Sequence, residues 1–469
     1  MKKYTGILFT AIFVWVQFGC KKQLDALPND ALVDGNTITS QQTANIALNG
    51  VYYRFANASA ISTDWLDNEI DGGILTGYMD DGTNTLAEAT NVLGKTPMNS
   101  EWGKEYTLIN AANNVIQGVN KLDDKIFSNN RKQQILAEAR CLRAYGHFKL
   151  LSWFGQWYDV NSAYGVLLRK DFITSTNFPQ ARATVKDSYD FILDDINYAI
   201  DNAALSGKNI NVNKWTAMAL KMRVLLNRGQ GDDYTQCVTL GDSIISNGPY
   251  TLEANLQDIF YSKGLSSNEV MLGIQPQPGQ DGYYYNTSGN YVVRSSYYVV
   301  TDALNDLLAN DPRKTWIIGD AGARGKGYFF IKYVQPSLTT TLISEVAYAF
   351  RLSEVYLMEA EAIARSGGSL NTARDLLKTV LAHAGVTDFT AVDAAVTADD
   401  LETQLYYEYV RNFIGEDDMY YRALLRFPLA TVTQLRPTIT SKEQYILPIP
   451  HDEFTTNPLI GDQNPGYAK

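Results

Sequence analysis

The chain contains little cysteine and little histidine, three residues of each among 469. Cys141 and Cys237 lie in segments with helical periodicity, so the sequence predicts no disulfide framework. The histidines, His147, His383 and His451, lie far apart along the chain and lack the spacing of metal ligands. We therefore expect no disulfide scaffold, no histidine metal site and no cofactor.

Positive charge is also scarce, with 40 lysines and arginines against 51 acidic residues and a net charge of −11. This balance argues against nucleic acid as a partner. The motifs G-x-S-x-G, H-E-x-x-H and C-x-x-C are missing. "GARGKG" (322–327) lacks the spacing of a phosphate loop, and "DDGTN" (80–84) lacks the distal glutamate of a calcium loop. We interpret both as turns and predict no metal site.

Hydrophobic runs long enough to span a bilayer are missing as well. After Lys2 and Lys3, residues 6–18 form an apolar run of 13 residues, short of the roughly 20 that a membrane helix needs. This pattern predicts an export signal over residues 1–19. The junction resembles a bacterial lipoprotein signal, which implies that Cys20 begins the mature chain and carries lipid on its thiol. The alternative is an ordinary secretory signal followed by an incidental cysteine.

Amphipathic helices account for most of the remaining sequence. A polar tether is expected at 20–39, followed by a single domain at 40–469. Within it, the apolar stripe that follows Thr184 and Asp187 begins with a capping box. Short Gly or Pro breaks separate such helices, and small residues occur where helices would cross. This pattern predicts four tetratricopeptide-like helix pairs, near 40–121, 130–204, 212–247 and 345–386. We predict a mainly α scaffold of these four pairs.

Two long stretches interrupt this helical pattern, at 57–98 and 251–340. They contain aromatic residues and strand-like pieces such as "YYVV", and connections of this length in a compact domain are usually functional or disordered. The runs of aromatics argue against disorder. We expect irregular or short-stranded excursions on one face of the scaffold, and a Pro-rich tail at 428–469.

Three stretches resemble one family, the SusD/RagB-like nutrient-binding lipoproteins. They are "ILAEARCLRAYGHFKLLSWFG" (135–155), "RLSEVYLMEAEAIARSGG" (351–368) and the tail "YILPIPHDEFTTNPLIGDQNPGY" (445–467). The resemblance implies a helical scaffold whose excursions hold a glycan. It also implies lipid anchoring to the outer membrane, on the cell exterior, above a SusC-like TonB-dependent transporter.

Aromatic side chains in the excursions are the candidate ligand-binding residues. Sugars stack their C–H faces on aromatic rings, and the chain has 30 tyrosines. Consecutive tyrosines at 283–285 cannot all face inward on a strand, because neighbouring side chains alternate. The alternative for each ring is that it covers the helical core. The candidates are Trp65, Tyr78, Tyr283, Tyr284, Tyr285, Tyr291 and Arg294.

Two other functions remain open, a glycoside hydrolase and a helical scaffold that binds a protein or peptide. Hydrolysis requires two carboxyl groups roughly 5 to 9.5 Å apart. The candidates lie on one predicted helix and in one acidic run, and we expect both groups to face solvent: Glu354, Glu359, Glu361, Glu416, Asp417 and Asp418. We therefore predict a binding protein and no enzyme.

Overall fold

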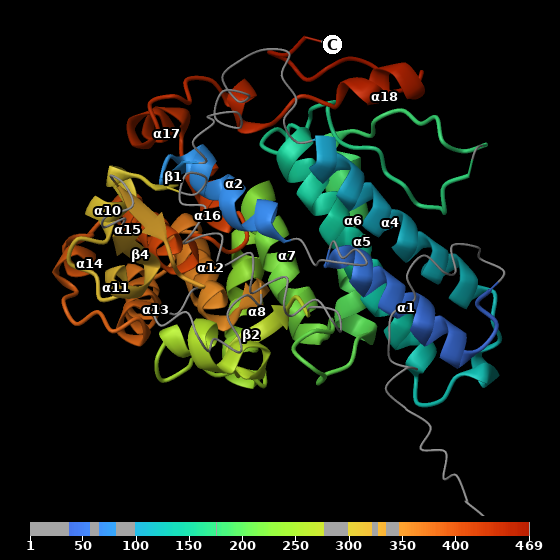
Figure 1. The fold of residues 1–469 in the computed structure, drawn as a ribbon, viewed down its shortest axis with the longest axis horizontal. Helices are drawn as coiled ribbons and strands as arrows, with labels where there is room; N and C mark the ends of the chain where they lie inside the picture. Colours follow the sequence, from blue (N-terminus) through green and yellow to red (C-terminus); the bar gives the residue numbers. More distant parts are fainter. Residues whose placement is uncertain are drawn as a thin grey trace, which may run out of the picture.

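The computed structural model describes residues 37–56, 65–80, 99–174, 176–275, 299–320, 327–333 and 347–468. Over these ranges the chain is mainly helical, which confirms the predicted fold class (Figure 1). Short strands form two small sheets beside the helices. No helix in the described ranges is both long enough and apolar enough to cross a membrane.

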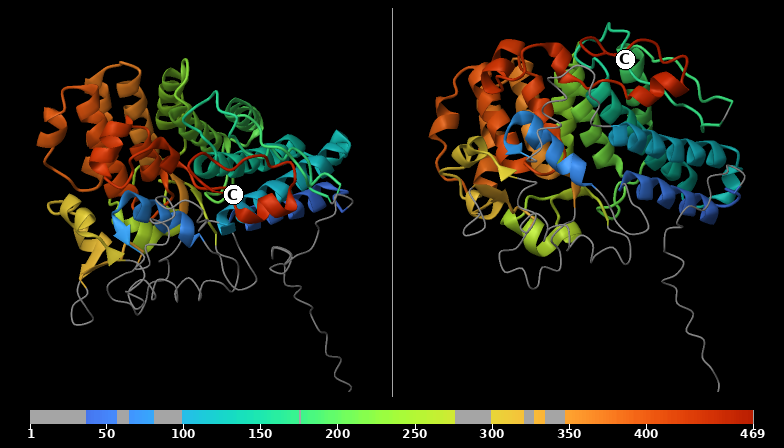
Figure 2. Two further views of the ribbon diagram at one scale, coloured as in Figure 1. Left: turned by 90° about the horizontal axis from the view of Figure 1, so that it is seen from above. Right: turned by 45° about the horizontal axis from the view of Figure 1, so that its top comes forward.

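The long helices form an array in which neighbours along the chain are also neighbours in space. Each helix of the first half packs on the next one, and α12 then contacts α7, α8, α13 and α15 (Figure 2). The array consists of α1 (Gln41–Phe55), α4 (Asn99–Asn120), α5 (Arg131–Phe154), α6 (Val185–Asn202), α7 (Lys214–Arg228), α8 (Asp233–Asn247), α12 (Leu352–Arg365), α13 (Leu370–His383), α15 (Ala398–Phe413) and α16 (Met419–Leu425).

Local sequence sets the ends of these helices. The Thr184 side chain accepts a hydrogen bond from the Asp187 backbone N–H at 3.0 Å, which is one half of the predicted capping box. The Asp187 carboxylate accepts from the Thr184 hydroxyl at 2.8 Å instead of from the Thr184 backbone. α7 begins with a capping box on Asn213. Gly229 and Gly367 follow α7 and α12 with φ of 54° and 72°, a conformation that strongly favours glycine.

The predicted helix start near residue 345 is wrong. Residues Tyr348–Arg351 form strand β6, which pairs antiparallel with β2 (Val270–Gly273), and α12 begins only at Leu352. Every residue of both strands is buried, Arg351 included, and this explains the error, because a short buried strand has no alternation that distinguishes it from a helix.

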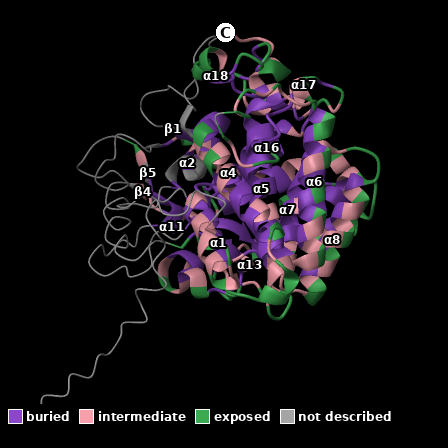
Figure 3. Ribbon diagram, turned by 90° about the vertical axis from the view of Figure 1, so that its right-hand side faces the viewer, coloured by how far each residue is buried: buried purple, intermediate pink, exposed green. Residues whose placement is uncertain are grey.

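A second sheet lies at one side of the helical array, next to α2 (Leu66–Thr76). Its four antiparallel strands run in the order β1 (Met79–Asp80), β3 (Val299–Val300), β5 (Tyr328–Phe330) and β4 (Ile318–Asp320). Figures 1 and 3 both place α2, β1 and β4 together on this side. The pairing of Met79 with Val300 joins the first predicted excursion to the second.

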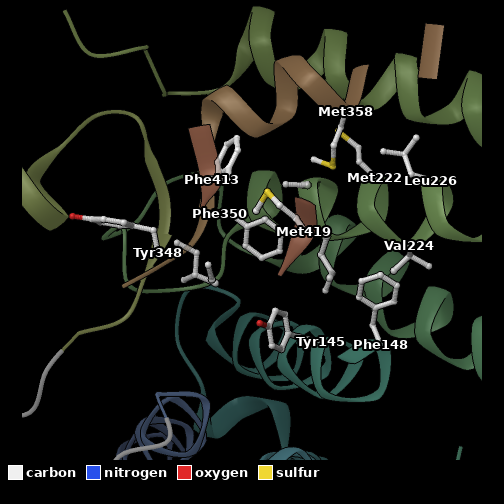
Figure 4. Packing of buried hydrophobic residues seen from close by; sticks show 14 of the residues in the cluster. Tyr145, Phe148, Met222, Val224, Leu226, Tyr348, Phe350, Met358, Phe413 and Met419 are labelled. Atoms are coloured by element: carbon white, nitrogen blue, oxygen red, sulfur yellow. The ribbon is translucent and has the colours of Figure 1, made fainter. Parts of the chain in front are cut away.

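One continuous core runs through the array, and its buried residues fill the interior in Figure 3. At its centre, Tyr145 and Phe148 of α5 lie near Met222 of α7, Phe350 of β6 and Met419 of α16 (Figure 4). Full burial of side chains of this size contributes about 1.5–3 kcal/mol each. The core therefore ties the first half of the chain to the second.

The tail returns to the ends of α4 and α5. It contains α17 (Leu429–Leu435), a short 3₁₀ helix (Lys442–Tyr445) and α18 (His451–Thr456), joined by coil. Leu447 N–H donates to the carbonyl of Trp153, and the Asn464 side chain donates to the carbonyl of Phe154. The indole of Trp102 donates to Glu453 at 2.9 Å. These contacts fix the tail on the scaffold.

Candidate ligand-binding face

The four-stranded sheet brings the two excursions into one place, and Tyr78 lies at its edge. The Tyr78 carbonyl accepts a hydrogen bond from Thr301 N–H at 3.1 Å, and Gly77 ends α2 with φ of 83°. The Tyr78 ring is half-buried. Burial raises the pKa of its hydroxyl, although a hydrogen bond with Tyr406 opposes the shift. Tyr78 therefore has one side against the core and one side toward solvent.

Helix α15 adds two side chains to the surroundings of Tyr78. Tyr407 and Arg411 are both half-exposed, and the guanidinium carbon lies 5.9 Å from the centre of the Tyr407 ring. Both groups act on the pKa of Tyr78, Tyr407 upward and Arg411 downward. Tyr78, Tyr407 and Arg411 are called the tyrosine–arginine patch below. It offers two rings for stacking and a planar donor for hydroxyl groups.

The sequence could have predicted two members of this patch that we did not name. In "YYEYVRN" (406–412), Tyr406 and Tyr409 are buried. Tyr407 and Arg411, four residues apart, lie together on the other face of the helix. A tyrosine and an arginine on the solvent side of an amphipathic helix were the available signal.

The proposed role of Trp65 requires correction. Trp65 is only 3% exposed, and its ring lies 5.2 Å from Phe55 in an edge-on contact and 6.4 Å from Tyr145. These partners belong to α1 and α5. The ring covers the helical core, which is the alternative open for every aromatic candidate, and no face of it is available to a ligand.

The other predicted site residues lie outside the described residues. They are Tyr283, Tyr284, Tyr285, Tyr291 and Arg294 in the second excursion, and Cys20 at the expected start of the mature chain. Their part in binding or anchoring stays a prediction.

The acidic run after α15 is not solvated, contrary to our expectation. Glu416, Asp417 and Asp418, called the acidic segment below, are at most 4% exposed. Lys332 and Arg351 bind Glu416, Lys149 and Arg223 bind Asp417, and Lys149 and Arg422 bind Asp418. All of these partners except Arg422 come from distant parts of the chain. The segment therefore links α5, α7, β6 and the second excursion.

Ion pairing also sets the charge of this segment. Burial alone would raise the pKa of Asp417, but Lys149 and Arg223 hold it below its ordinary value. Burial of Lys332 lowers the pKa of its ammonium group to about 8, and Glu416 opposes that shift. Asp417 is thus a permanently ionised carboxylate that cannot donate a proton at neutral pH.

The glutamates of α12 are buried too, so their predicted exposure is wrong. Glu354 accepts from Arg223 Nη2 at 2.8 Å, and Glu361 accepts from Arg426 Nη2 at 2.6 Å. Glu359 is 3% exposed. The physical reason is that α12 has helices on several sides, and none of these three positions faces solvent. None of these carboxylates is free to reach a glycosidic bond.

His147 has a structural role. It is fully buried, its Nδ1 lies 3.0 Å from the Arg143 carbonyl, and its Nε2 lies 3.2 Å from Arg169 N. Burial lowers its pKa to about 3. The imidazole is therefore neutral and accepts the hydrogen bond from the Arg169 N–H.

An open groove of about 730 Å³ lies between the coil around 168–183 and α6. Its aromatic member, Phe191, has Arg143 4.9 Å from its ring centre, Lys170 at 5.4 Å and His147 edge-on at 5.3 Å. These neighbours occupy the ring. The groove therefore offers one aromatic ring, whereas the tyrosine–arginine patch has two half-exposed tyrosines.

Two family models match the chain. One is described as "Starch-binding associating with outer membrane" and covers residues 24–226; the other is described as "SusD family" and covers residues 283–438. A curated "SusD-like protein" of Bacteroides ovatus is 24% identical over 329 residues. That alignment covers 60% of this chain and 57% of the relative, so little more than half of the relative's length is matched.

Solved structures share the fold over nearly the whole chain. A "Putative sugar binding protein" from Bacteroides vulgatus has a TM-score of 0.72 at 22% identity, with 92% of this chain and 100% of that chain covered. A "Laminarin binding SusD-like protein" has a TM-score of 0.71 at 21% identity, with the same shares covered. The helical array and its flanking excursions thus define a SusD-like fold. The chain belongs to the SusD/RagB-like family.

Proposed function

We propose that the chain is a non-catalytic, lipid-anchored protein that binds an oligosaccharide or polysaccharide outside the cell. It passes the bound glycan to a SusC-like TonB-dependent transporter in the outer membrane. Lipid on Cys20 holds it there. The starch-binding description of one matching family model and the laminarin-binding name of one structural neighbour support this proposal.

The tyrosine–arginine patch is the observation that carries the proposal. It lies beside the sheet that joins both excursions, and it combines half-exposed rings with a guanidinium group. Rings stack on the C–H faces of a sugar, while Arg411 donates to its hydroxyl groups. The sequence-based candidates Tyr283, Tyr284, Tyr285, Tyr291 and Arg294 remain part of the proposal.

Calorimetry on a glycan found by array screening tests the site. Tyr407→Ala should weaken binding by roughly 5- to 150-fold, the effect of removing a ring at a binding hot spot. Its melting temperature should change little, because the ring is half-exposed.

Tyr198→Ala is the matched control. Tyr198 is another half-exposed tyrosine under an arginine, with Arg140 at 4.3 Å, but it belongs to α6 in the scaffold. It should leave affinity unchanged. Equal losses in both variants, or none in Tyr407→Ala, would contradict the placement of the site at the patch.

The binding-only function has its own test. The purified chain is incubated with the glycan that it binds, and reducing ends are measured over time. Release of reducing ends above a blank would contradict the proposal. Retention on a peptide column, with no response to any glycan, would instead favour the scaffold that binds a protein or peptide.

A further inference from the structure

The guanidinium group of Arg436, the residue after α17, lies beside the tyrosine–arginine patch (Figure 1). Its Nε donates to the carbonyl of Leu75 in the last turn of α2 at 3.1 Å. A Cβ built on Gly77 would lie 2.5 Å from Nη1, so the lack of a side chain at Gly77 makes room for this group. Tyr78 is the next residue, and Tyr406, which hydrogen-bonds with Tyr78, also acts on Arg436. Arg436 therefore belongs to the surroundings of Tyr78.

No carboxylate neutralises the charge of Arg436 within the described residues. The side chains that act on its pKa are two uncharged tyrosines, Tyr421 and Tyr406, and burial lowers that pKa below its ordinary value. The end of α2 supplies only the partial negative charge of a helix C-terminus. A half-buried positive charge is costly unless a counter-charge pairs with it. The candidate face thus contains a guanidinium group that lacks a counter-charge.

Arg436 also has free donors. Only its Nε donates to an acceptor in the part of the chain that the structure describes, so the N–H groups on Nη1 and Nη2 are available. Arg411 of the patch is similar, because its Nε donates to the carbonyl of Leu307 at 3.2 Å. Asp311 lies 3.9 Å from Arg411, but both of its oxygens accept hydrogen bonds from Arg313 at 2.8 and 2.7 Å. Two guanidinium groups with free donors therefore lie beside the same rings.

We propose that the glycan bound at the patch is acidic, with carboxylate groups on its sugar units that pair with Arg436. This inference rests on the proposed function and names the substrate class of the same site. A carboxylate accepts two parallel N–H bonds from a guanidinium group and neutralises its charge. A hydroxyl group of a neutral sugar also accepts from arginine, but it leaves the charge without a partner. The site therefore prefers uronic acid units to neutral hexoses.

Carboxyl reduction tests the substrate class on the unmodified protein. The purified chain is titrated by calorimetry with oligogalacturonate, oligoglucuronate and alginate oligosaccharides, and with each of them after its carboxyl groups have been reduced to primary alcohols. Reduction removes the charge and keeps the order and linkage of the sugars. At least one acidic form should bind, and its reduced form should bind roughly 10- to 150-fold more weakly, the effect of a hydrogen bond to a charged group.

Two outcomes of this titration would overturn the inference and leave the proposed function standing. One is equal affinity for an acidic form and its reduced form. The other is binding of neutral starch or laminarin oligosaccharides with no response to any acidic form. Absence of binding to every glycan would instead contradict the proposed function, and this inference with it.

A pair of arginine variants locates the charge that recognises the carboxylate. Arg436→Gln should lower the affinity for the acidic form to about that for the reduced form, and it should leave the affinity for the reduced form nearly unchanged. Arg182→Gln is the matched control, because Arg182 is another half-buried arginine without an ion pair in the described chain. It lies in the coil before α6, where it donates to the carbonyls of Gly165 and Phe154 at 3.0 and 3.1 Å.

The control should leave both affinities unchanged. Equal losses in the two variants, or an unchanged preference for the acidic form in Arg436→Gln, would contradict the role of Arg436. The melting temperature of each variant is measured alongside. If Arg436→Gln unfolds below the temperature of the assay, the comparison of acidic and reduced forms on the unmodified protein still decides the substrate class.

Discussion

Glu359 and Glu361 are two residues apart on α12 and have opposite electrostatic surroundings. Burial raises the pKa of Glu359 to about 8, and the neighbouring Asp242 carboxylate adds to the shift. Burial would raise the pKa of Glu361 as well, but Arg426 and Arg365 lower it to about 2. The folded state therefore disfavours ionisation of Glu359 and favours ionisation of Glu361.

Glu359→Gln should stabilise the protein at high pH. The folded pKa of Glu359 lies above its ordinary value of 4.5, so the wild type loses stability as pH rises from about 4.5 to about 8. Glutamine does not ionise and avoids this loss. Denaturant unfolding should give little difference at pH 5 and a gain on the order of 1 kcal/mol at pH 9.

Glu361→Gln provides the control of opposite sign. Its carboxylate is ionised and paired with two arginines, so the variant should lose about 3 kcal/mol at neutral pH. This loss should shrink only as pH falls below 4.5 toward 2. A gain at pH 9 in both variants would rule out the charge explanation for Glu359.

Single residues of the candidate site were only partly predictable. Tyr78 is half-buried at the edge of the sheet and stays a candidate, but the same reasoning selects Trp65, which the core covers. The sequence around an aromatic residue in a long connection is the same whether its ring is exposed or buried. Burial depends on contacts in the folded chain, such as that of Trp65 with Phe55. Tyr407 was missed because we treated helices as scaffold only.

The C-terminal end of α15 depends on a side chain from the second excursion. Lys332 donates to the carbonyls of Asn412 at 2.8 Å and Ile414 at 3.0 Å, and to Glu416 at 2.7 Å. Gly415 follows with φ of 76°, and a Cβ there would lie 2.0 Å from the Phe330 ring. Helix and excursion are thus fitted to one another.

Lys332→Met should cost about 3–5 kcal/mol of stability, because it removes one partner of a buried ion pair and the donor of two helix-end carbonyls. Urea unfolding measures the loss. Lys186→Met is the control, since its pair with Asp190 is exposed to solvent and should contribute little to stability. Similar values for both lysines would show that the Lys332 contacts contribute little.

Helices were more predictable than strands, for a physical reason. Neighbouring residues determine where α6 starts, because Thr184 caps the helix and an apolar stripe follows it. Strands β1 and β3 are two residues long and pair Met79 with Val300 across more than 200 residues. Two residues are too few to show the alternation of a strand. The partner strand lies too far along the chain for a local sequence pattern to predict the pairing.

At the scale of the whole molecule, the anchor is a prediction from the sequence. Cys20→Ala should leave a folded protein that no longer pellets with the outer membrane, because acyl chains hold it through roughly 0.8 kcal/mol per buried CH₂. Cell fractionation and the melting temperature are measured together. A variant that still pellets at high salt would contradict lipid attachment as the sole anchor.

The overall fold followed from the sequence because three motifs, spaced from residue 135 to the tail, resemble one family. Periodicity alone indicated a mainly helical scaffold. It did not indicate that α12 lies among several helices, and for that reason we expected Glu354 to face solvent. The surroundings of a helix come from chain topology, which a single stretch of sequence does not contain.

The acidic segment has a consequence for the order of folding. Lys149 binds Asp417, 268 residues further along the chain, and Arg223 binds the same residue across 194. As the chain is synthesised from its N-terminus, both cations emerge long before their carboxylates. Closing loops of this length is entropically slow. We therefore expect the first half of the chain to stay partly assembled, with Lys149 and Arg223 unpaired, until the last fifth of the chain completes the scaffold.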